Sequence, residues 1–132
     1  MPRRSDCPVS NVLDLVGDKW SLLIVRDLLF FGRRSYSELQ SADERVATNI
    51  LSNRLARLEA HGIISRQRDP EDRRRKLYGL TAAGVDLLPI VLEMILWSSK
   101  HDPNTNAHAQ LVHRAKHDRE NLVRDIRVRL AR

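Results

Sequence analysis

The sequence is poor in cysteine, glycine and aromatic residues. Its one cysteine, Cys7, excludes a disulfide within the chain and leaves only a bond to another subunit or to a small thiol. No phosphate-binding glycine loop, nucleophile elbow, metal-hydrolase motif or pair of catalytic carboxylates is recognisable, and only five glycines could form such turns. His113 and His117 are four residues apart, but a histidine pair without a further ligand does not predict a metal site. We therefore expect no enzymatic activity, no cofactor and no metal.

Long apolar runs are absent as well. The most apolar one, residues 87–97, contains Pro89 and Glu93 and is too short to span a bilayer. Residues 1–6 include basic side chains, but no apolar segment follows them, so no signal peptide is expected. The sequence predicts a cytoplasmic protein that does not enter a membrane.

Positive charge is what the chain has in excess. Its formal net charge is +6 and its pI is about 10.2, which favours a polyanionic partner, either a nucleic acid or an anionic membrane surface. The hydrophobic content of 42% fits a folded protein, and 132 residues suffice for one domain with a modest core and an appendage. Net charge alone does not decide between the two kinds of partner.

Residues 46–61 have the periodicity of an amphipathic helix. Leu51, Leu55 and Leu58 fall on one side of a helical wheel with 3.6 residues per turn. Gly62 then marks the helix end, because glycine adopts the left-handed conformation there without steric penalty. The other side of the helix carries small and polar residues: Asn49, Ser52, Asn53 and Ala56.

Two strand-like runs follow, residues 63–68 and 76–80, and they flank a charged tip at residues 69–75. This pattern predicts a β-hairpin with Arg73 and Arg74 at its tip. A helix with short polar side chains can enter the major groove of DNA, and arginines on an adjoining hairpin suit the minor groove or the phosphates. A solvated surface helix with a charged loop is the alternative, and the combination of the two elements argues against it.

The preceding segments complete a recognisable topology. Asp18 is expected to cap a helix, Ser37 and Gln40 to form a capping box, and residues 42–45 to form a turn. Helix, strand, helix, helix, strand, strand is the winged helix-turn-helix order, so we predict a mainly α fold with a small β-hairpin wing and extra dimerisation helices. The expected elements are helices at 8–16 and 19–30, a strand at 33–36, a helix at 38–41, a helix from residue 47 or 48 to about 61, and strands at 63–68 and 76–80.

Two further helices are expected after the wing. Thr81 caps the first, residues 82–100, which carries a broad apolar stripe and should kink at Pro89. A polar linker at residues 101–107 leads to the second, residues 109–132, which is apolar on one side only.

The two apolar stripes predict a homodimer, because a monomer of this size would leave both exposed. We divide the chain accordingly. Residues 1–100 are expected to form a DNA-binding domain with an N-terminal dimerisation helix. Residues 101–132 are expected to form a linker and a C-terminal helix that takes part in dimerisation.

Eight residues are candidates for DNA contact. Asp72 should orient one wing guanidinium through a charge-assisted hydrogen bond. Arg54 lies on the flank of the reading helix, the helix that begins at Ala47 or Thr48 and ends near His61, and could equally be a structural residue paired with an acid. The candidates are Arg34, Thr48, Asn49, Ser52, Asn53, Arg54, Arg73 and Arg74.

Cys7 is the candidate reactive residue. It precedes the helix at residues 8–16 and is close in sequence to Arg3 and Arg4, and both features lower the pKa of a thiol. Asp6 acts in the opposite direction. A quiet, partly buried thiol is the alternative.

Five segments carry a family pattern: residues 7–9 (CPV), 13–20 (LDLVGDKW), 28–29 (LL), 34–39 (RSYSEL) and 51–55 (LSNRL). In these segments the chain resembles the HxlR-type transcriptional regulators, bacterial winged helix-turn-helix repressors or activators related to the MarR group. The resemblance covers about residues 5–100. The wing departs from it, because residues 69–74 and the later Leu80-Thr81-x-x-Gly84 are closer to MarR-type wings. Several HxlR-type proteins use a cysteine at the position matching Cys7 to sense oxidants or electrophiles.

The residues and the resemblance together predict a sequence-specific regulator that binds double-stranded DNA as a homodimer on an inverted repeat. The resemblance adds an oxidant or electrophile response through Cys7. One alternative is a MarR-like repressor that responds to a small molecule without thiol sensing. Another is a basic adaptor at a membrane surface.

Overall fold

The computed structural model describes residues 3–131, and the chain divides into two compact units with the boundary between Gly84 and Val85. This boundary comes earlier in the chain than the domain boundary that we expected after residue 100. The expected domain boundary stays a prediction. Residues 1–2 and 132, included in the expected N-terminal segment and final helix, lie outside the described residues.

The first unit begins with α1 (Pro8–Val16) and α2 (Ser21–Arg26). Asp18 lies just before α2, and its carboxylate accepts hydrogen bonds from the backbone N–H groups of Trp20 and Ser21 at 3.0 and 3.1 Å. The Ser21 hydroxyl donates to the other carboxylate oxygen at 2.5 Å. The predicted cap is therefore confirmed, and it satisfies N–H groups that the first turn of a helix leaves without partners.

The predicted helix at residues 19–30 is present, but it begins two residues later, at Ser21, and α2 continues as a π-helical turn, η1 (Asp27–Phe31). Gly32 follows with a φ of 64°, a left-handed conformation that glycine adopts at little cost, and its N–H donates to the Asp27 carbonyl oxygen. Such wide turns are rare and often occur at functional sites. Here the turn leaves Asp27 almost completely buried.

α3 (Tyr36–Gln40) is the first helix of the helix-turn-helix. The capping box predicted for Ser37 and Gln40 is wrong, because the cap is Ser35. Its hydroxyl accepts from the Glu38 N–H at 3.2 Å, and the Glu38 carboxylate accepts from the Ser35 N–H at 3.0 Å. Both pairs fit the same sequence pattern, but Ser35 is the residue that the fold holds extended.

α4 (Thr48–Ala60) is the reading helix, and it has the predicted core face. Leu51, Leu55 and Leu58 are buried, so truncating any one of them to alanine would cost about 2–5 kcal/mol of stability. Gly62 has a φ of 74°, and the N–H of Ile63 donates to the Leu58 carbonyl oxygen at 2.9 Å. This Schellman arrangement confirms the predicted helix end.

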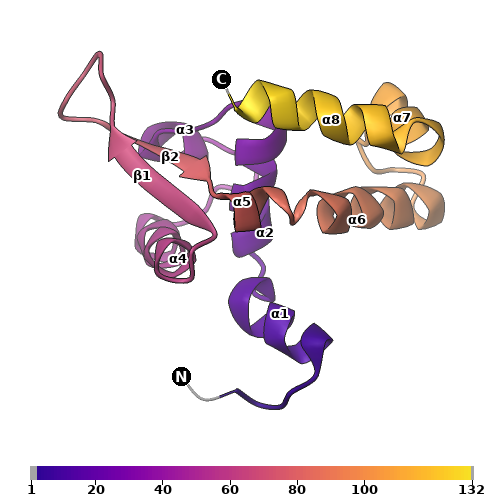
Figure 1. Ribbon diagram of the computed structural model, residues 1–132, viewed down its shortest axis with the longest axis horizontal. Coiled ribbons are helices and arrows are strands. Elements are labelled where there is room, and N and C mark those ends of the chain that lie inside the picture. Colours follow the sequence, from indigo (N-terminus) through magenta and orange to yellow (C-terminus); the bar gives the residue numbers. More distant parts are fainter. Residues whose placement is uncertain (1–2, 132) are drawn as a thin grey trace. The chain divides into compact units, whose positions relative to one another are not determined.

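β1 (Ile64–Arg68) and β2 (Lys76–Leu80) pair antiparallel and form the predicted wing. The strand predicted at residues 33–36 is reduced to a single bridge between Ser35 and Leu77. The first unit is thus a winged helix-turn-helix, as predicted (Figure 1).

The expected kinked helix at residues 82–100 is instead two helices, α5 (Ala82–Val85) and α6 (Leu88–His101). Pro89 lies in the first turn of α6, where its missing N–H would have had no helical partner. The disruption near Pro89 was correctly expected, but it is a break before the proline rather than a kink at it.

The stretch Ala82–His101 is long and apolar enough to cross a membrane by those two measures alone. Its most apolar window has a mean hydropathy of 1.5 and is 22% buried. In the structure the stretch is interrupted before Leu88, and its Glu93 forms an ion pair with Arg119.

The single helix expected at residues 109–132 is wrong. The structure has α7 (Ala109–His117) and α8 (Arg119–Leu130), separated at Asp118, which has a φ of −145° and a ψ of 38°. The Asp118 N–H closes the last turn of α7 and its carbonyl oxygen accepts from the first turn of α8. The buried apolar side chains of the second unit come from α6, α7 and α8: Leu88, Val91, Leu92, Ala115, Leu122 and Ile126.

Candidate nucleic-acid interface

The exposed face of α4 carries four of the predicted contact residues. Thr48, Asn49, Ser52 and Asn53 are all exposed, whereas the leucines on the other side of the helix are buried. Short side chains that hydrogen-bond on an exposed helix face let the helix backbone approach base edges. This face therefore has the chemistry that a helix in the major groove requires.

Tyr36 fixes the start of α4, a role that the sequence analysis missed. Its hydroxyl donates to the Thr48 carbonyl oxygen at 2.9 Å and lies 3.2 Å from the Ser52 hydroxyl. The N-cap position, Ala47, offers no side-chain cap, so α3 holds the first turn of α4 in place instead. The only sequence signal for Tyr36 was its position in the RSYSEL segment.

Arg54 is turned toward the protein. Its Nε donates to Oδ2 of Asp18 at 2.8 Å, and its Nη1 donates to Oδ1 of Asn53. Partial burial raises the pKa of Asp18. Hydrogen bonds from Ser21, Arg54 and two backbone N–H groups outweigh this effect and lower the pKa from 3.8 to about 2. Of the two roles that the sequence left open for Arg54, the structure shows the second, a structural residue paired with an acid.

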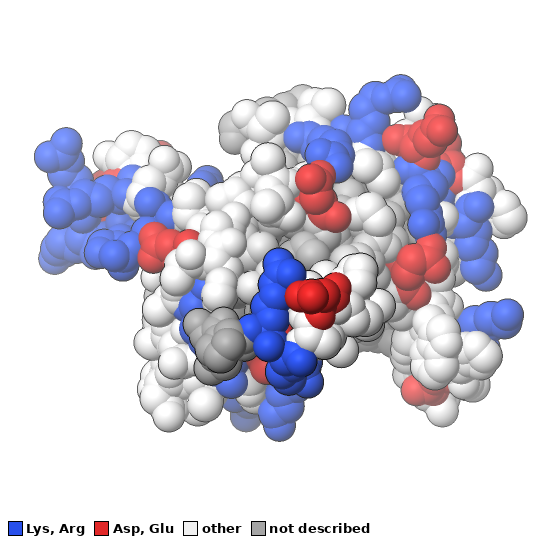
Figure 2. All heavy atoms as spheres, turned by 60° about the horizontal axis from the view of Figure 1, so that its bottom comes forward, with Lys and Arg blue, Asp and Glu red and all other residues white. Residues whose placement is uncertain are grey.

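The two arginines predicted at the wing tip, Arg73 and Arg74, are exposed to solvent. The Arg74 side chain is 93% exposed, and its Nε lies 3.5 Å from Oδ1 of Asp72, so the predicted contact with Asp72 is present but long. Arg73 is exposed too. Figure 2 shows basic side chains gathered over the wing. Three exposed residues that the sequence analysis did not single out add to this charge: Arg66, Arg68 and Lys76.

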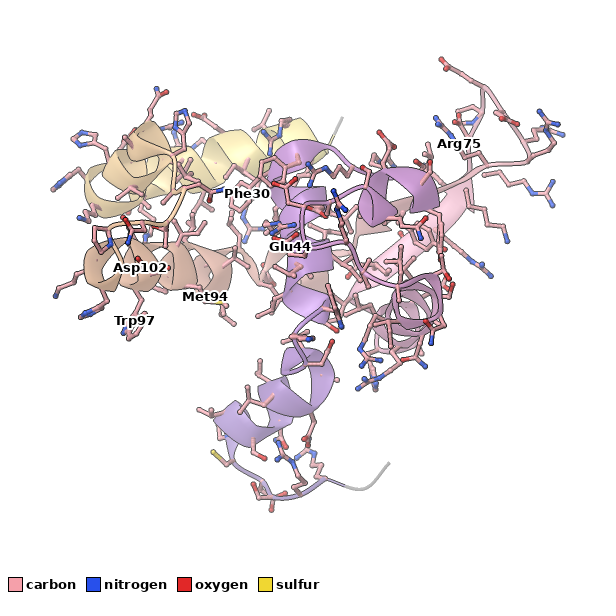
Figure 3. The ribbon with its side chains drawn as sticks, turned by 180° about the vertical axis from the view of Figure 1, so that it is seen from behind. Phe30, Glu44, Arg75, Met94, Trp97 and Asp102 are labelled. Atoms are coloured by element: carbon pink, nitrogen blue, oxygen red, sulfur yellow. The ribbon has the colours of Figure 1, made fainter. Side chains whose placement is uncertain are left out.

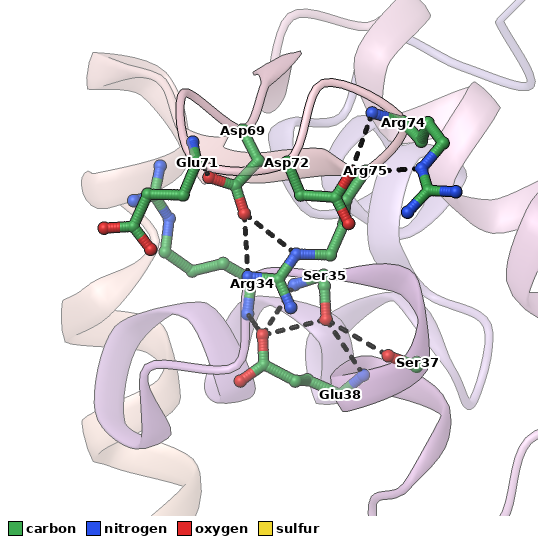
Figure 4. A network of polar contacts seen from close by, with 9 residues as sticks. All are labelled: Arg34, Ser35, Ser37, Glu38, Asp69, Glu71, Asp72, Arg74 and Arg75. Carbon is green, nitrogen blue, oxygen red and sulfur yellow. Dashed lines mark hydrogen bonds and ion pairs between the residues drawn. The ribbon is translucent and has the colours of Figure 1, made fainter.

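Arg75 belongs to the base of the wing. Its Nη2 and Nε lie 2.8 and 2.9 Å from Oδ2 of Asp69, whose side chain is 5% exposed (Figure 4). Hydrogen bonds from the Glu71 N–H and from Arg75 lower the pKa of Asp69. The pair closes the loop and leaves Arg73 and Arg74 free to extend into solvent.

Arg34 joins the start of α3 to the wing. Its Nε donates to the Tyr78 carbonyl oxygen at 3.2 Å, and the Tyr78 N–H donates to the Arg34 carbonyl oxygen at 2.8 Å. The Arg34 N–H also lies 3.4 Å from Glu38, within the polar network of Figure 4. This predicted contact residue is therefore partly engaged within the protein.

A cluster of charges holds the turn of the helix-turn-helix. Arg26 donates two hydrogen bonds to Glu44, at 2.7 and 2.9 Å, and Asp27 lies within 3.0 Å of both Arg26 and Arg33. The bond from Arg26 is the main cause that lowers the pKa of Glu44 to about 2, whereas burial raises the pKa of Asp27 despite both arginines. Glu44, labelled in Figure 3, lies in the turn before α4, so the cluster ties this turn to α2 and η1.

Cys7 is exposed and occupies the N-cap position of α1. The backbone N–H groups of Ser10 and Val9 lower the pKa of its thiol, which agrees in direction with the prediction. Arg4 is instead paired with Asp14 at 2.7 Å. Within residues 3–131, no group of three His, Cys, Asp or Glu side chains could hold a metal ion.

Exposed apolar side chains line α1 and α6. On α6, Ile90, Met94 and Trp97 follow one another at spacings of four and three residues, and Trp97 is 68% exposed. Figure 3 shows Met94 and Trp97 projecting from the side of α6 that faces away from α7. On α1, Val9 and Leu13 are exposed at a spacing of four. Such rows commonly mark interaction surfaces.

Comparison with protein families gives a match over most of the chain. The model of the HxlR-like helix-turn-helix family matches residues 15–106. An uncharacterized HTH-type transcriptional regulator of Synechocystis sp., sll1512, is 42% identical over 88 residues, which make up 67% of this chain. The match spans 64% of that protein, just under two thirds of its length.

Solved structures agree with this assignment. The crystal structure of PA1607 has a TM-score of 0.70 at 33% identity and covers 79% of this chain and 72% of its own. The redox regulator HypR in its oxidised form has a TM-score of 0.61 at 32% identity and covers 72% of this chain and 97% of its own. The matched proteins whose role is named are transcription regulators rather than enzymes. The chain belongs to the HxlR-like helix-turn-helix family.

Proposed function

We propose that this protein is a cytoplasmic transcriptional regulator that binds an inverted-repeat operator as a homodimer and responds to oxidants or electrophiles through Cys7. The observation that carries the proposal is the exposed polar face of α4 in the same compact unit as a wing with exposed arginines. Membership of a helix-turn-helix family supports it.

The DNA contacts divide between the two elements. Asn49, Ser52 and Asn53 meet base edges or phosphates in the major groove, and Thr48 at the helix start meets the DNA backbone. The wing arginines, Arg73 and Arg74, enter the minor groove or bind the phosphates beside it. Two further candidates, Arg34 and Arg54, act by holding the wing and the reading helix in position, since their guanidinium groups already have partners in the protein.

The exposed apolar row of α1 and the exposed apolar row of α6 each provide a surface for a second copy of the chain. Burying Trp97 and its neighbours removes apolar area that otherwise stays in water, which favours association. A two-fold dimer then presents two α4 helices about 34 Å apart, one turn of DNA, and each reads half of a palindrome.

The proposed switch runs from Cys7 through α1 to the reading helix. At the other end of α1, the Asp14 carbonyl oxygen accepts a hydrogen bond from Nη2 of Arg57 at 3.2 Å, and Arg57 belongs to α4. Modification of Cys7 adds bulk or charge at the dimer surface, and a shift of α1 is passed on to α4 by this contact. With one cysteine per chain, the product is an intersubunit disulfide, a mixed disulfide or an adduct.

A membrane-surface adaptor is the second candidate, favoured by the apolar composition of Ala82–His101. Flotation with anionic lipid vesicles separates it from the DNA reader. Vesicle binding without duplex binding would support the adaptor.

Selection from a pool of random duplexes tests the proposal. The purified protein is incubated with the pool, and the retained DNA is sequenced. We expect one enriched motif with two-fold symmetry and half-site centres about 10 base pairs apart. Retained duplexes without any common motif would contradict sequence-specific binding.

A further inference from the structure

We propose that Arg54, held by Asp18, orients the Asn53 carboxamide so that Asn53 offers hydrogen-bond donors to the DNA and selects guanine over adenine at the base pair it contacts. This inference rests on the proposed function, because it concerns how the reading helix distinguishes bases. It makes Arg54 and Asp18 positioning residues for specificity.

The orientation of Asn53 follows from the chemistry of its neighbour. A guanidinium has only N–H donors, so the atom of Asn53 that faces Nη1 of Arg54 must be the amide oxygen. The usual ambiguity between the oxygen and nitrogen of an asparagine side chain is thereby removed.

Arg54 is itself fixed by the scaffold. Its Nε donates to Oδ2 of Asp18, and both side chains are only about one-fifth exposed, at 21% and 20%. The Asp18 carboxylate is held in turn by Ser21 and by the start of α2. A continuous set of charge-assisted and neutral hydrogen bonds therefore connects α2 to the exposed face of α4.

The consequence is an asymmetric side chain on the DNA side. Asn53 is exposed, and its Nδ2 makes no hydrogen bond to any of residues 3–131, so two N–H donors remain for a ligand. A free asparagine binds adenine with both ends of its amide, accepting from N6 and donating to N7. Here the accepting end already faces a cation, which also repels the N6 amino group. Guanine presents two acceptors, N7 and O6, which suit donors and a nearby positive charge.

The test measures base preference at single positions of the selected operator. Duplexes with each base pair replaced in turn are titrated with the wild type, Asn53→Ala, Arg54→Met and the control Arg57→Met. Arg57 is also a half-buried arginine of α4, but its guanidinium contacts the Asp14 carbonyl oxygen instead of Asn53. Methionine keeps the apolar stem and removes the donors.

We expect Asn53→Ala to abolish the preference at one base pair in each half-site. At that pair the wild type should favour guanine over adenine about tenfold in Kd. Arg54→Met should shift this ratio about tenfold toward adenine and leave the other positions unchanged. Arg57→Met should keep the wild-type order of base preference at every position, even if its affinity for all duplexes changes by one common factor through the lost contact with α1. A residue that merely stabilises the fold would weaken binding to all duplexes alike.

Three results would overturn the inference while the wild type still binds its operator: adenine favoured at the pair sensitive to Asn53→Ala, no sensitive pair, or an unchanged ratio in Arg54→Met. Should Arg54→Met fail to fold, Arg54→Lys replaces it, because one ammonium group cannot reproduce the fork that spans both partners. If the wild type prefers no duplex over another, the proposed function itself fails, and the inference with it.

Discussion

Nε of Arg54 lies 2.8 Å from Oδ2 of Asp18, although 36 positions separate the two residues in the sequence. Asp18 precedes α2 and Arg54 lies in the middle of α4, so this one ion pair joins the scaffold helix to the reading helix. The same carboxylate caps α2. Its loss should therefore affect both the stability of the fold and the position of α4.

The first prediction concerns stability and pH. The pKa of Asp18 is lowered from its ordinary value of 3.8 to about 2, so the carboxylate stabilises the folded state above pH 3.8 and loses this effect as the pH falls to about 2. The difference corresponds to about 2 kcal/mol. We expect Asp18→Asn to lower the free energy of unfolding by about that amount at pH 7, measured by urea denaturation.

The control is Asp43→Asn, an exposed acid in the turn before α4, which should change stability by less than about 0.5 kcal/mol. The gap between wild type and Asp18→Asn should shrink between pH 4 and pH 2. A gap that stays constant over this range would show that the charge of Asp18 contributes nothing.

The second prediction concerns the wing. Arg73→Ala or Arg74→Ala should weaken binding to specific and non-specific duplexes alike, and reduce the slope of log K against log salt concentration by about one. The control is Arg124→Ala, which removes an exposed arginine on α8. Gel shifts between about 50 and 200 mM salt provide the slopes. Unchanged slopes in both wing variants would remove the wing from the interface.

The third prediction concerns the dimer. Trp97→Glu places a charge in the exposed apolar row of α6 and should convert the dimer to a monomer at micromolar concentration, because an unpaired charge cannot be buried cheaply. Sedimentation velocity measures the change. Phe31→Glu is the control, since Phe31 is an exposed apolar residue of η1 and lies outside the helices expected to take part in dimerisation. A wild-type monomer, or a dimer unaffected by Trp97→Glu, would exclude this surface.

The fourth prediction concerns the switch. Diamide should change the operator affinity of the wild type but not of Cys7→Ser, because the thiolate is the reacting species. Arg57→Met should bind the operator yet respond less, since it lacks the contact with the Asp14 carbonyl oxygen. Mass spectrometry without reductant identifies the oxidised product. Equal responses in wild type and Cys7→Ser would favour a small-molecule effector instead.

Much of the winged helix-turn-helix was predictable because its signals are local. The buried leucines of α4, the left-handed Gly62 and the Asp18 cap each depend on residues a few positions apart. The exposed arginines of the wing tip were predictable for the same reason. Long charged side chains at the tip of a short hairpin have little protein surface to pack against, so they extend into solvent.

The wrong predictions fall where two local sequence signals were equivalent, or where contacts between distant parts of the chain determine the structure. Ser35 and Ser37 both precede a suitable capping partner, and the bridge from Ser35 to Leu77 selects the first. Asp118 sits inside a helical pattern, but the chain bends there. The partners of Arg54 and Arg34 come from elements 36 and 44 residues away, so no periodicity in the sequence could reveal them.

The most direct test of the central claim is the mass of the complex between the protein and its selected operator, measured by sedimentation equilibrium. If two chains each read half of an inverted repeat, the complex at saturation contains two chains for each duplex, and a duplex with one half-site scrambled binds much more weakly. A saturated complex with a single chain, or equal binding to the intact and the half-scrambled duplex, would contradict the account.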